Sequence, residues 1–306
     1  MDAIFSFQLP LMLVLQGLRT PMMTKFVELV TSLGEQAIVI VVLVTIYWCI
    51  DKKKGYLIAS SVLFSTVTMQ ILKAIFRVPR PFMKYPDQVV GERQHTATGY
   101  SFPSGHSTTA SSFYGALYKG FQQKWIKAIA LILVIAIPLS RLYLGVHWPM
   151  DVAVGTLIGI FFSFIMASTI MKIYESDKLF NRVAIIVSVL MLPMAAVLGI
   201  ALDWTDIDYR AFHNLMQNGA LAGGMFLGSY FERKNVSFMI SGSIKKRARN
   251  LALGILMAAP IVAILMVIPF MHYFLEAIAY AFLGFWVSFL YPMIAVKLGW
   301  MERESK

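Results

Sequence analysis

Charged residues and cysteine are scarce in this sequence. Only 14% of its 306 residues are charged, whereas 58% are hydrophobic. A soluble globular chain of this length carries a larger charged fraction on its surface, so the composition excludes that class. The single cysteine, Cys49, excludes a disulfide framework and a cluster of thiol metal ligands. It lies in an apolar run, as a core or lipid-facing residue does. We therefore expect an integral membrane protein.

Acidic residues are outnumbered by basic ones. Lys and Arg total 27, whereas Asp and Glu total 16, which gives a net charge of +11. Nucleic-acid-binding proteins show such an excess, but they present it on one soluble face. Here the basic residues lie mainly in short loops between apolar runs. We therefore expect anionic lipids as partners of these loops, and no nucleic acid.

Long apolar stretches dominate the chain and predict an all-α fold, a polytopic transmembrane helical bundle. Each is close to the ~20 residues that cross the hydrocarbon of a bilayer. Glu28, Glu35 and Gln36 interrupt the first stretch, and the third and seventh are rich in small residues. The nine expected crossings are 26–50, 55–77, 104–121, 124–145, 149–173, 182–202, 213–231, 249–269 and 272–298.

The first 25 residues predict an interfacial helix. Phe5, Leu9, Met12 and Leu13 recur at helical spacing, as in an amphipathic helix at a membrane surface, and Pro10 would kink it or delay its start. The segment has neither the basic leader nor the small-residue cleavage site of a signal peptide.

The distribution of Lys and Arg predicts the orientation. Alternate loops, at 52–54, 119–127, 172–182, 233–249 and 297–306, hold eighteen basic residues, against nine on the other side. Because basic loops stay in the cytoplasm, we expect a multi-pass protein of the cell (inner) membrane with a cytoplasmic carboxyl terminus, which includes Lys306. The loops at 78–103, 142–148 and 203–212 would face outward.

Three polar blocks fall on this outer side, where charge at membrane depth usually marks function. The first places Lys73 and Arg80 about two helical turns apart, within reach of one anion. The second contains Pro103-Ser104-Gly105-His106 at a helix start, where Gly105 permits close backbone approach and free amides favour a phosphate.

The third block contains Arg141, His147 and Asp151. The spacing of four between His147 and Asp151 lets the carboxylate accept a hydrogen bond from one imidazole nitrogen on a helical turn. The other nitrogen then keeps a lone pair, which suits a nucleophile. A basic residue at a helix end or a Pro-Ser-Gly run has an ordinary structural explanation alone, but the combination on one side predicts an active site.

These blocks resemble the signature of the type 2 phosphatidic acid phosphatase superfamily. The signature is Lys, six residues, Arg-Pro; then Pro-Ser-Gly-His; then Ser-Arg, five residues, His, three residues, Asp. This sequence has each block without departure. The resemblance covers about residues 26–202 and implies a six-helix phosphatase core. The expected division is therefore an interfacial helix at 1–25, the core at 26–202 and an extension of about three spans at 203–306.

The resemblance also implies an enzyme and a role for each site residue. His147 would attack phosphorus and form a phosphohistidine, Asp151 would fix its tautomer, and His106 would protonate the leaving oxygen. No metal or other cofactor is implied, because basic side chains neutralise the phosphate charge. The residues implied to bind the phosphate are Lys73, Arg80, Ser104, Gly105 and Arg141.

The substrate implied is a lipid phosphate or diphosphate in the membrane, hydrolysed at the extracytoplasmic face. The same signature serves polyprenyl diphosphates such as undecaprenyl diphosphate, phosphatidic acid, phosphatidylglycerol phosphate and sphingoid phosphates in phospholipid metabolism. It also serves a soluble sugar phosphate, glucose 6-phosphate. The polar segment 82–99 is either a lid or a solvated connector. The extension leaves open a lipid entrance, a homodimer contact or a separate task.

Two other classes of membrane or phosphate-binding protein are compatible with parts of this pattern. A transporter or channel with a phosphate-binding site could line its path with Glu35, His213 and Glu276, although the sequence shows no internal repeat. A vanadate-dependent haloperoxidase shares the three blocks, but the many apolar stretches argue against it.

Overall fold

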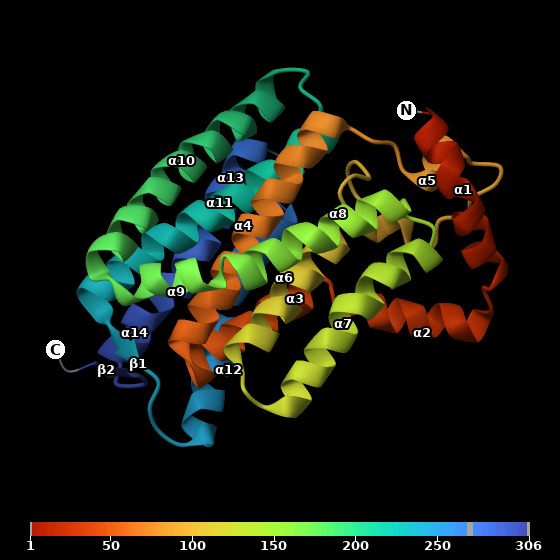
Figure 1. Ribbon diagram of the computed structural model, residues 1–306. Coiled ribbons are helices and arrows are strands. Elements are labelled where there is room, and N and C mark those ends of the chain that lie inside the picture. The colour runs from red at the N-terminus through yellow and green to blue at the C-terminus, as the bar shows by residue number, and fades with distance from the viewer. Residues whose placement is uncertain (1, 268–271, 305–306) are drawn as a thin grey trace. The chain divides into compact units, whose positions relative to one another are not determined.

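The computed structural model describes residues 2–267 and 272–304. Lys306 and the end of the expected span 249–269 lie outside the described residues. Within them the chain is helical almost throughout, as the all-α prediction requires (Figure 1). The described strands are short: β1 (Phe238–Met239) pairs antiparallel with β2 (Glu302–Arg303).

The chain forms two compact units. The first contains Met1–Ile40 and Ile58–Ser168, and the second contains Val41–Leu57 and Thr169–Lys306. The helices α3 (Gln36–Thr45), α4 (Lys52–Phe76) and α9 (Ala167–Glu175) contribute to both. The predicted division at residues 25 and 202 stays a prediction.

The first unit holds all three polar blocks. Its helix α6 (Gly105–Gly120) packs against both α7 (Lys124–Tyr143) and α8 (Pro149–Ile160) (Figure 1). Glycine makes this approach close, because a Cβ at Gly159 would lie 2.7 Å from the backbone of α6. The other elements that lie wholly in this unit are α1 (Asp2–Gly17), α2 (Pro21–Ser32), α5 (Pro81–Lys84), η2 (Gln94–Thr96) and η3 (Phe161–Ile165).

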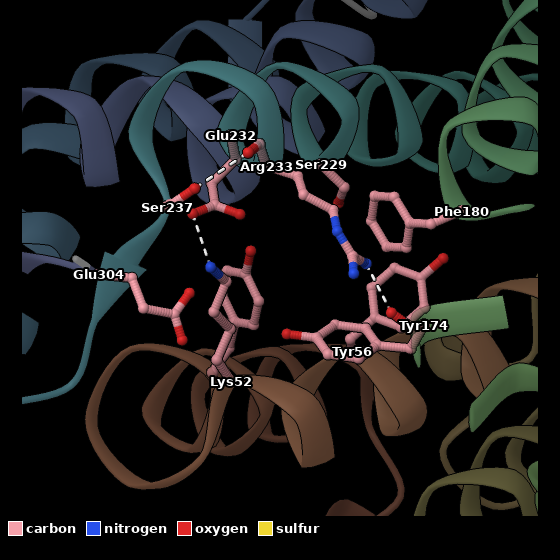
Figure 2. A pocket seen from close by; sticks show the side chains of 10 residues that line it. Lys52, Tyr56, Tyr174, Phe180, Ser229, Glu232, Arg233, Ser237 and Glu304 are labelled. Atoms are coloured by element: carbon pink, nitrogen blue, oxygen red, sulfur yellow. Dashed lines mark hydrogen bonds and ion pairs between the residues drawn. The ribbon is translucent and has the colours of Figure 1, made fainter. Parts of the chain in front are cut away.

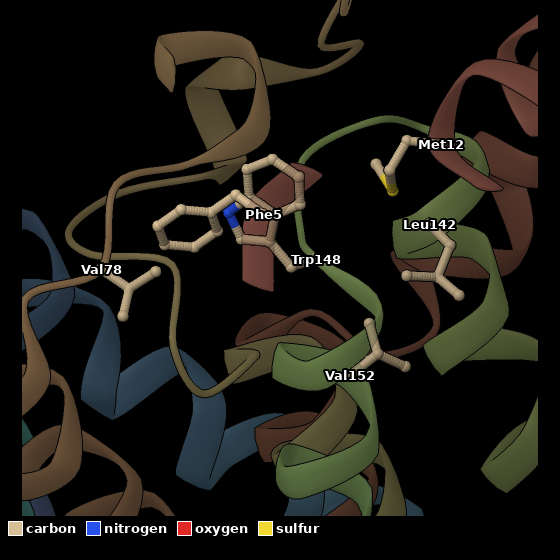
Figure 3. Close-up of a cluster of buried hydrophobic side chains, with 6 residues drawn as sticks. All are labelled: Phe5, Met12, Val78, Leu142, Trp148 and Val152. Carbon is tan, nitrogen blue, oxygen red and sulfur yellow. The ribbon is translucent and has the colours of Figure 1, made fainter. Parts of the chain in front are cut away.

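Helix α1 supports the loop that carries the third polar block. Phe5 and Met12 are buried in a cluster with Trp148 (Figure 3). The Phe5 and Trp148 rings lie 5.0 Å apart, and the Gln8 side chain accepts a hydrogen bond from the Met150 amide at 2.9 Å. Two of the four apolar positions expected to face lipid, Phe5 and Met12, thus pack inside the protein.

The second unit is built around α11 (Tyr209–Phe231), which packs against α10 (Asp177–Trp204) and α13 (Tyr273–Phe285). Small residues again permit the approach, since a Cβ at Gly224 would meet the Ala281 backbone of α13. Its elements are η1 (Ile46–Ile50), α10 (Asp177–Trp204), α11 (Tyr209–Phe231), η4 (Glu232–Val236), β1, α12 (Ile244–Val267), α13 (Tyr273–Phe285), η6 (Trp286–Leu290), α14 (Tyr291–Lys297) and β2.

Fewer helices than the nine expected meet the length and composition of a membrane span. Among the described residues there are five, or up to seven if each bent helix pair counts as one span. The segment expected at 26–50 is divided between α2, α3 and η1. The segments 104–121 and 213–231 are helices, α6 and α11, that do not qualify as spans. Small and polar residues lower their hydropathy, and these residues are largely buried in helix packing.

Candidate active site

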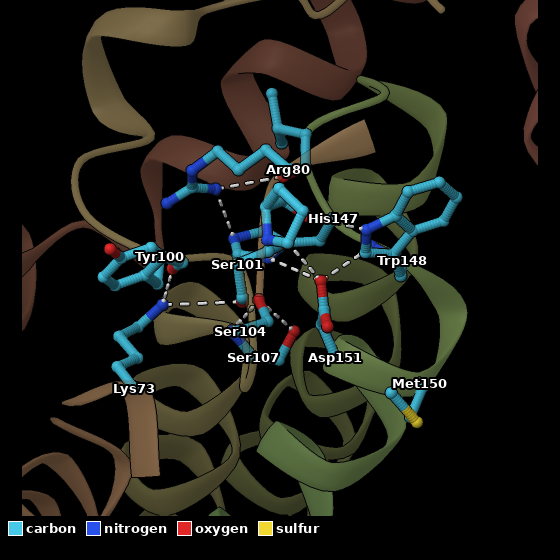
Figure 4. Close-up of polar contacts among 12 residues, drawn as sticks. Lys73, Arg80, Tyr100, Ser101, Ser104, Ser107, His147, Trp148, Met150 and Asp151 are labelled. Atoms are coloured by element: carbon cyan, nitrogen blue, oxygen red, sulfur yellow. Dashed lines mark hydrogen bonds and ion pairs between the residues drawn. The ribbon is translucent and has the colours of Figure 1, made fainter. Parts of the chain in front are cut away.

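The fold brings the three polar blocks to one place (Figure 4). Helix ends supply most of the side chains, because five helices begin or end there. The contributors are Lys73 in the last turn of α4, Arg80 just before α5, Ser104 at the amino cap of α6, Arg141 in the last turn of α7, His147 in the following connection and Asp151 in the first turn of α8.

His147 is held at both ring nitrogens. Its Nε2 lies 3.1 Å from Arg80 Nη1, and its Nδ1 lies 3.4 Å from Asp151 Oδ2. A guanidinium can only donate, so Nε2 accepts and the ring proton belongs on Nδ1, toward the carboxylate. Burial lowers the pKa of the His147 imidazole well below its usual value, and the nearby cations of Arg80, Lys73 and Arg141 lower this pKa further. A neutral imidazole with its lone pair on Nε2 follows.

Asp151 has a further partner that sequence reasoning missed. The Ser101 hydroxyl donates to Asp151 Oδ2 and lies 3.4 Å from His147 Nδ1. The same carboxylate oxygen accepts from the Trp148 amide at 2.8 Å. Ser101 stands three residues before Ser104 in the second block, and only the folded chain shows that its hydroxyl faces Asp151.

Arg80 and Lys73 bind the backbone between the first two blocks. Arg80 donates to the carbonyls of Thr98 at 2.7 Å and Gly99 at 3.1 Å. Lys73 donates to the Tyr100 carbonyl. A phosphate that binds these cations must therefore replace some of these carbonyl contacts. The end of the segment 82–99 is thus tied to Arg80, and the residue that follows it, Tyr100, is tied to Lys73.

Arg141 is fully buried and is oriented by hydroxyl groups. Its Nη1 donates to Thr31 Oγ1 at 2.9 Å and its Nη2 to Thr96 Oγ1 at 3.4 Å. Neither threonine was predicted from the sequence. Thr31 belongs to α2, far from the three blocks along the chain, and Thr96 belongs to η2, in the connection between the first two blocks. The Arg141 Nε and His106 Nε2 atoms are buried and have no hydrogen-bond partner among the described residues. Both can therefore bond to a ligand.

Ser104 and Gly105 shape the start of α6. The Ser104 hydroxyl accepts from Ser107 Oγ at 2.9 Å, which leaves its own hydrogen free to donate. A Cβ at Gly105 would meet only Met69 Cε, at 3.7 Å. That is an ordinary contact, so packing within the protein does not require glycine at this position. The expected close approach at Gly105 concerns a ligand, and it stays a prediction.

Metal-ligating side chains do not gather at this site. Within residues 2–267 and 272–304, no group of three or more His, Cys, Asp or Glu side chains could hold a metal ion. The positive groups next to His147 are instead the side chains of Arg80, Lys73 and Arg141. The site therefore suits an anion bound by protein cations and hydroxyls.

Comparisons with known proteins agree with this geometry. Residues 54–175 match the PAP2 superfamily, and residues 216–303 match the transmembrane extension of PAP2 superfamily phosphatases. The first match contains all eight predicted site residues. The second falls within the predicted extension at 203–306.

Several curated proteins are similar to the chain. Undecaprenyl-diphosphatase of Sulfolobus acidocaldarius is 32% identical over 114 residues, which are 37% of this chain and 54% of that protein. Lipid A 1-phosphatase of Rhizobium etli is 32% identical over 115 residues, 37% of this chain and 49% of that protein. The chain thus spans about half the length of these two relatives.

A third relative is covered more fully. Bacitracin transport permease protein BcrC of Bacillus licheniformis is 30% identical over 147 residues, which are 45% of this chain and 70% of that protein. A solved structure, that of Aquifex aeolicus LpxE, is 28% identical with a TM-score of 0.47, over 53% of this chain and 95% of that one. With its three blocks assembled around His147 and both of its matched regions pointing to one family, the chain belongs to the PAP2 superfamily.

Proposed function

We propose that this protein is an integral membrane phosphatase that hydrolyses a lipid phosphate or diphosphate, with His147 as the nucleophile. The observation that carries the proposal is the arrangement at His147. Its Nε2 lies against Arg80 at 3.1 Å, while Asp151 Oδ2 lies 3.4 Å from Nδ1. A lone pair directed at a phosphate-binding cation is placed to attack a phosphorus bound there.

In the first step, the His147 Nε2 lone pair forms a bond to phosphorus while the bond from phosphorus to the lipid oxygen breaks. Arg80 turns from Nε2 to a phosphate oxygen, and Lys73 and Arg141 bind the other equatorial oxygens. His106, which the negative charge of the bound phosphate keeps protonated, donates the proton of its free Nε2 to the leaving oxygen and becomes neutral. The product is a phosphohistidine whose positive ring is stabilised by Asp151.

In the second step, water attacks phosphorus and the bond to His147 Nε2 breaks. His106, now neutral, takes a proton from the water, so both histidines return to their starting states and phosphate leaves. The Ser104 hydroxyl and the Gly105 amide would donate to the phosphate at the start of α6. No step needs a metal ion or another cofactor.

Lipid substrates suit a site at helix ends, because the phosphate lies at the membrane surface while the chains stay in hydrocarbon. The distribution of Lys and Arg supports an active site on the extracytoplasmic face. A reporter fused after Lys306 should therefore read cytoplasmic. A reading on the opposite side would reverse the proposed orientation.

The test of activity is phosphate release by the purified protein from a panel of substrates. The panel contains undecaprenyl diphosphate, phosphatidic acid, phosphatidylglycerol phosphate, a sphingoid phosphate and glucose 6-phosphate. We expect release in EDTA, an acid-labile phosphoenzyme with labelled substrate, and neither from His147→Ala. Unchanged turnover by His147→Ala would rule out the nucleophile, and loss of wild-type activity in EDTA would rule out a metal-free reaction.

One relative is named a transport permease, which keeps transport as a second candidate. The charged residues that such a path would use are already paired: Glu35 binds Arg93 at 2.5 Å, and His213 binds Glu276 at 2.8 Å. A transporter without hydrolytic activity should release no phosphate in the same assay, so one experiment separates the two classes.

A further inference from the structure

The second unit contains a polar cavity of its own. It has a volume of about 180 Å³ and is lined by side chains that include Lys52, Tyr56, Glu232, Arg233 and Glu304 (Figure 2). A water molecule needs roughly 10–15 Å³ on this measure, so the cavity has room for a small polar group. Lys52, Arg233 and Glu304 lie in or beside loops that the basic residues predict to be cytoplasmic.

Glu232 offers this cavity a buried acceptor. Its side chain is 3% exposed, and its Oε1 already accepts from Lys52 Nζ at 2.8 Å and from the Phe238 amide at 2.9 Å. The other oxygen, Oε2, has no hydrogen-bond partner among the described residues and points toward the middle of the cavity in Figure 2. Glu304, an exposed residue, adds a second carboxylate to the lining. Both can accept hydrogen bonds from an ammonium group.

Lys52 and Arg233 offer donors on the same cavity. Lys52 Nζ has three N–H groups, and it donates to two acceptors, Glu232 Oε1 at 2.8 Å and the Phe238 carbonyl at 3.3 Å. Arg233 uses Nε on Asp177 at 2.6 Å and Nη1 on the Tyr174 carbonyl at 2.6 Å. Its Nη2 has no partner in the described part of the chain. These donors suit the oxygens of a phosphate.

The charges and rings narrow the class of ligand. Two cations and two carboxylates line the cavity, so their formal charges cancel and a lone anion gains no net attraction. A dipolar ligand with one charge of each sign fits better. The Arg233 guanidinium already covers the rings of Phe180, at 4.4 Å, and Tyr174, at 5.1 Å. A trimethylammonium group would therefore compete for these faces, whereas a primary ammonium can use the carboxylate oxygens.

We propose that this cavity binds a phosphoethanolamine group in its diester form, with the phosphate against Arg233 and Lys52 and the ammonium against Glu232 and Glu304. The group can come from a lipid head group or from a soluble glycerol derivative. The site belongs to the second unit and does not depend on the proposed phosphatase activity. A diester also offers no terminal phosphate to a monoester phosphatase.

Calorimetry on the full chain in phosphatidylcholine nanodiscs tests the proposal. We expect glycerophosphoethanolamine to bind at least about tenfold more tightly than glycerophosphocholine or inorganic phosphate, because the primary ammonium adds charged hydrogen bonds. Glu232→Gln and Glu304→Gln should each weaken it by about tenfold, from the loss of one such bond. Glu175→Gln removes an exposed carboxylate that pairs with Lys53 outside the cavity, and it should leave binding unchanged.

Glu304 is exposed, so its variant remains informative if Glu232→Gln fails to fold. Equal affinity for the ethanolamine and choline compounds, no binding at all, or no effect of Glu304→Gln would overturn the proposal. Nanodiscs that contain phosphatidylethanolamine then show whether the bound group comes from a lipid head group or from a soluble compound. Loss of soluble-ligand binding there shows that the lipid head group occupies the cavity. Unchanged binding shows that the soluble compound is preferred, and both results support the same recognition chemistry.

Discussion

Asp151→Asn should cost this protein most of its turnover while leaving its shape intact. The Asp151 side chain is fully buried, and its Oδ2 accepts from Ser101 and from the Trp148 amide at 2.8 Å. An asparagine of the same size can retain both bonds, because its amide oxygen in the place of Oδ2 has two lone pairs. It has no negative charge to stabilise the positive ring that forms when His147 attacks phosphorus.

The distance between His147 and Asp151 sets the size of the expected loss of kcat. At 3.4 Å between His147 Nδ1 and Asp151 Oδ2, a full charge pair in an effective dielectric constant of about 20 interacts by about 5 kcal/mol. Part of that energy is also present before the reaction, as a hydrogen bond to neutral His147. We therefore expect kcat to fall by about 10³-fold, equivalent to about 4 kcal/mol, with a small change in KM.

Phosphate release under saturating phosphatidic acid or undecaprenyl diphosphate measures this loss. Asp177→Asn is the matched control, because Asp177 is exposed and pairs with Arg233 in the second unit; its kcat should stay at the wild-type value. Size-exclusion profiles and thermal unfolding of both variants check folding. A folded Asp151→Asn protein with kcat within tenfold of wild type would refute the role given to this carboxylate.

Three further predictions concern pH, orientation of a cation and helix packing. The depressed pKa of His147 means that the folded state favours the neutral ring, so the free energy of unfolding should fall as pH drops below the usual histidine value of 6.5; thermal unfolding from pH 8 to 5 should show a weaker decline for His147→Gln. Thr31→Val removes the hydroxyl that binds Arg141 at 2.9 Å and should lower kcat/KM by about tenfold, whereas Thr24→Val, on the same helix, should not. Gly159→Val would place Cβ about 2.7 Å from the α6 backbone and should lower stability by about 1–3 kcal/mol or more, seen as a lower Tm; an unchanged Tm would contradict the close α6–α8 contact.

The membrane class and the three blocks were readable from the sequence, because both depend on local properties. Apolar runs long enough to span a bilayer predict the helical bundle. The spacing between His147 and Asp151 predicts their contact, since four residues make about one helical turn. Arg141 is distant in sequence from Lys73 and Arg80, and the resemblance to the family signature predicted that all three share one site.

Tertiary structure alone decided which other groups complete that site. Ser101 and Thr31 carry ordinary hydroxyls, and nothing in their neighbours along the chain shows that one faces Asp151 and the other Arg141. The burial of α6 was likewise not predictable from its sequence. Its small polar residues give it low hydropathy, although most of its surface is packed against other helices. Composition measures the affinity of a segment for lipid, whereas burial depends on partners that only the folded chain brings together.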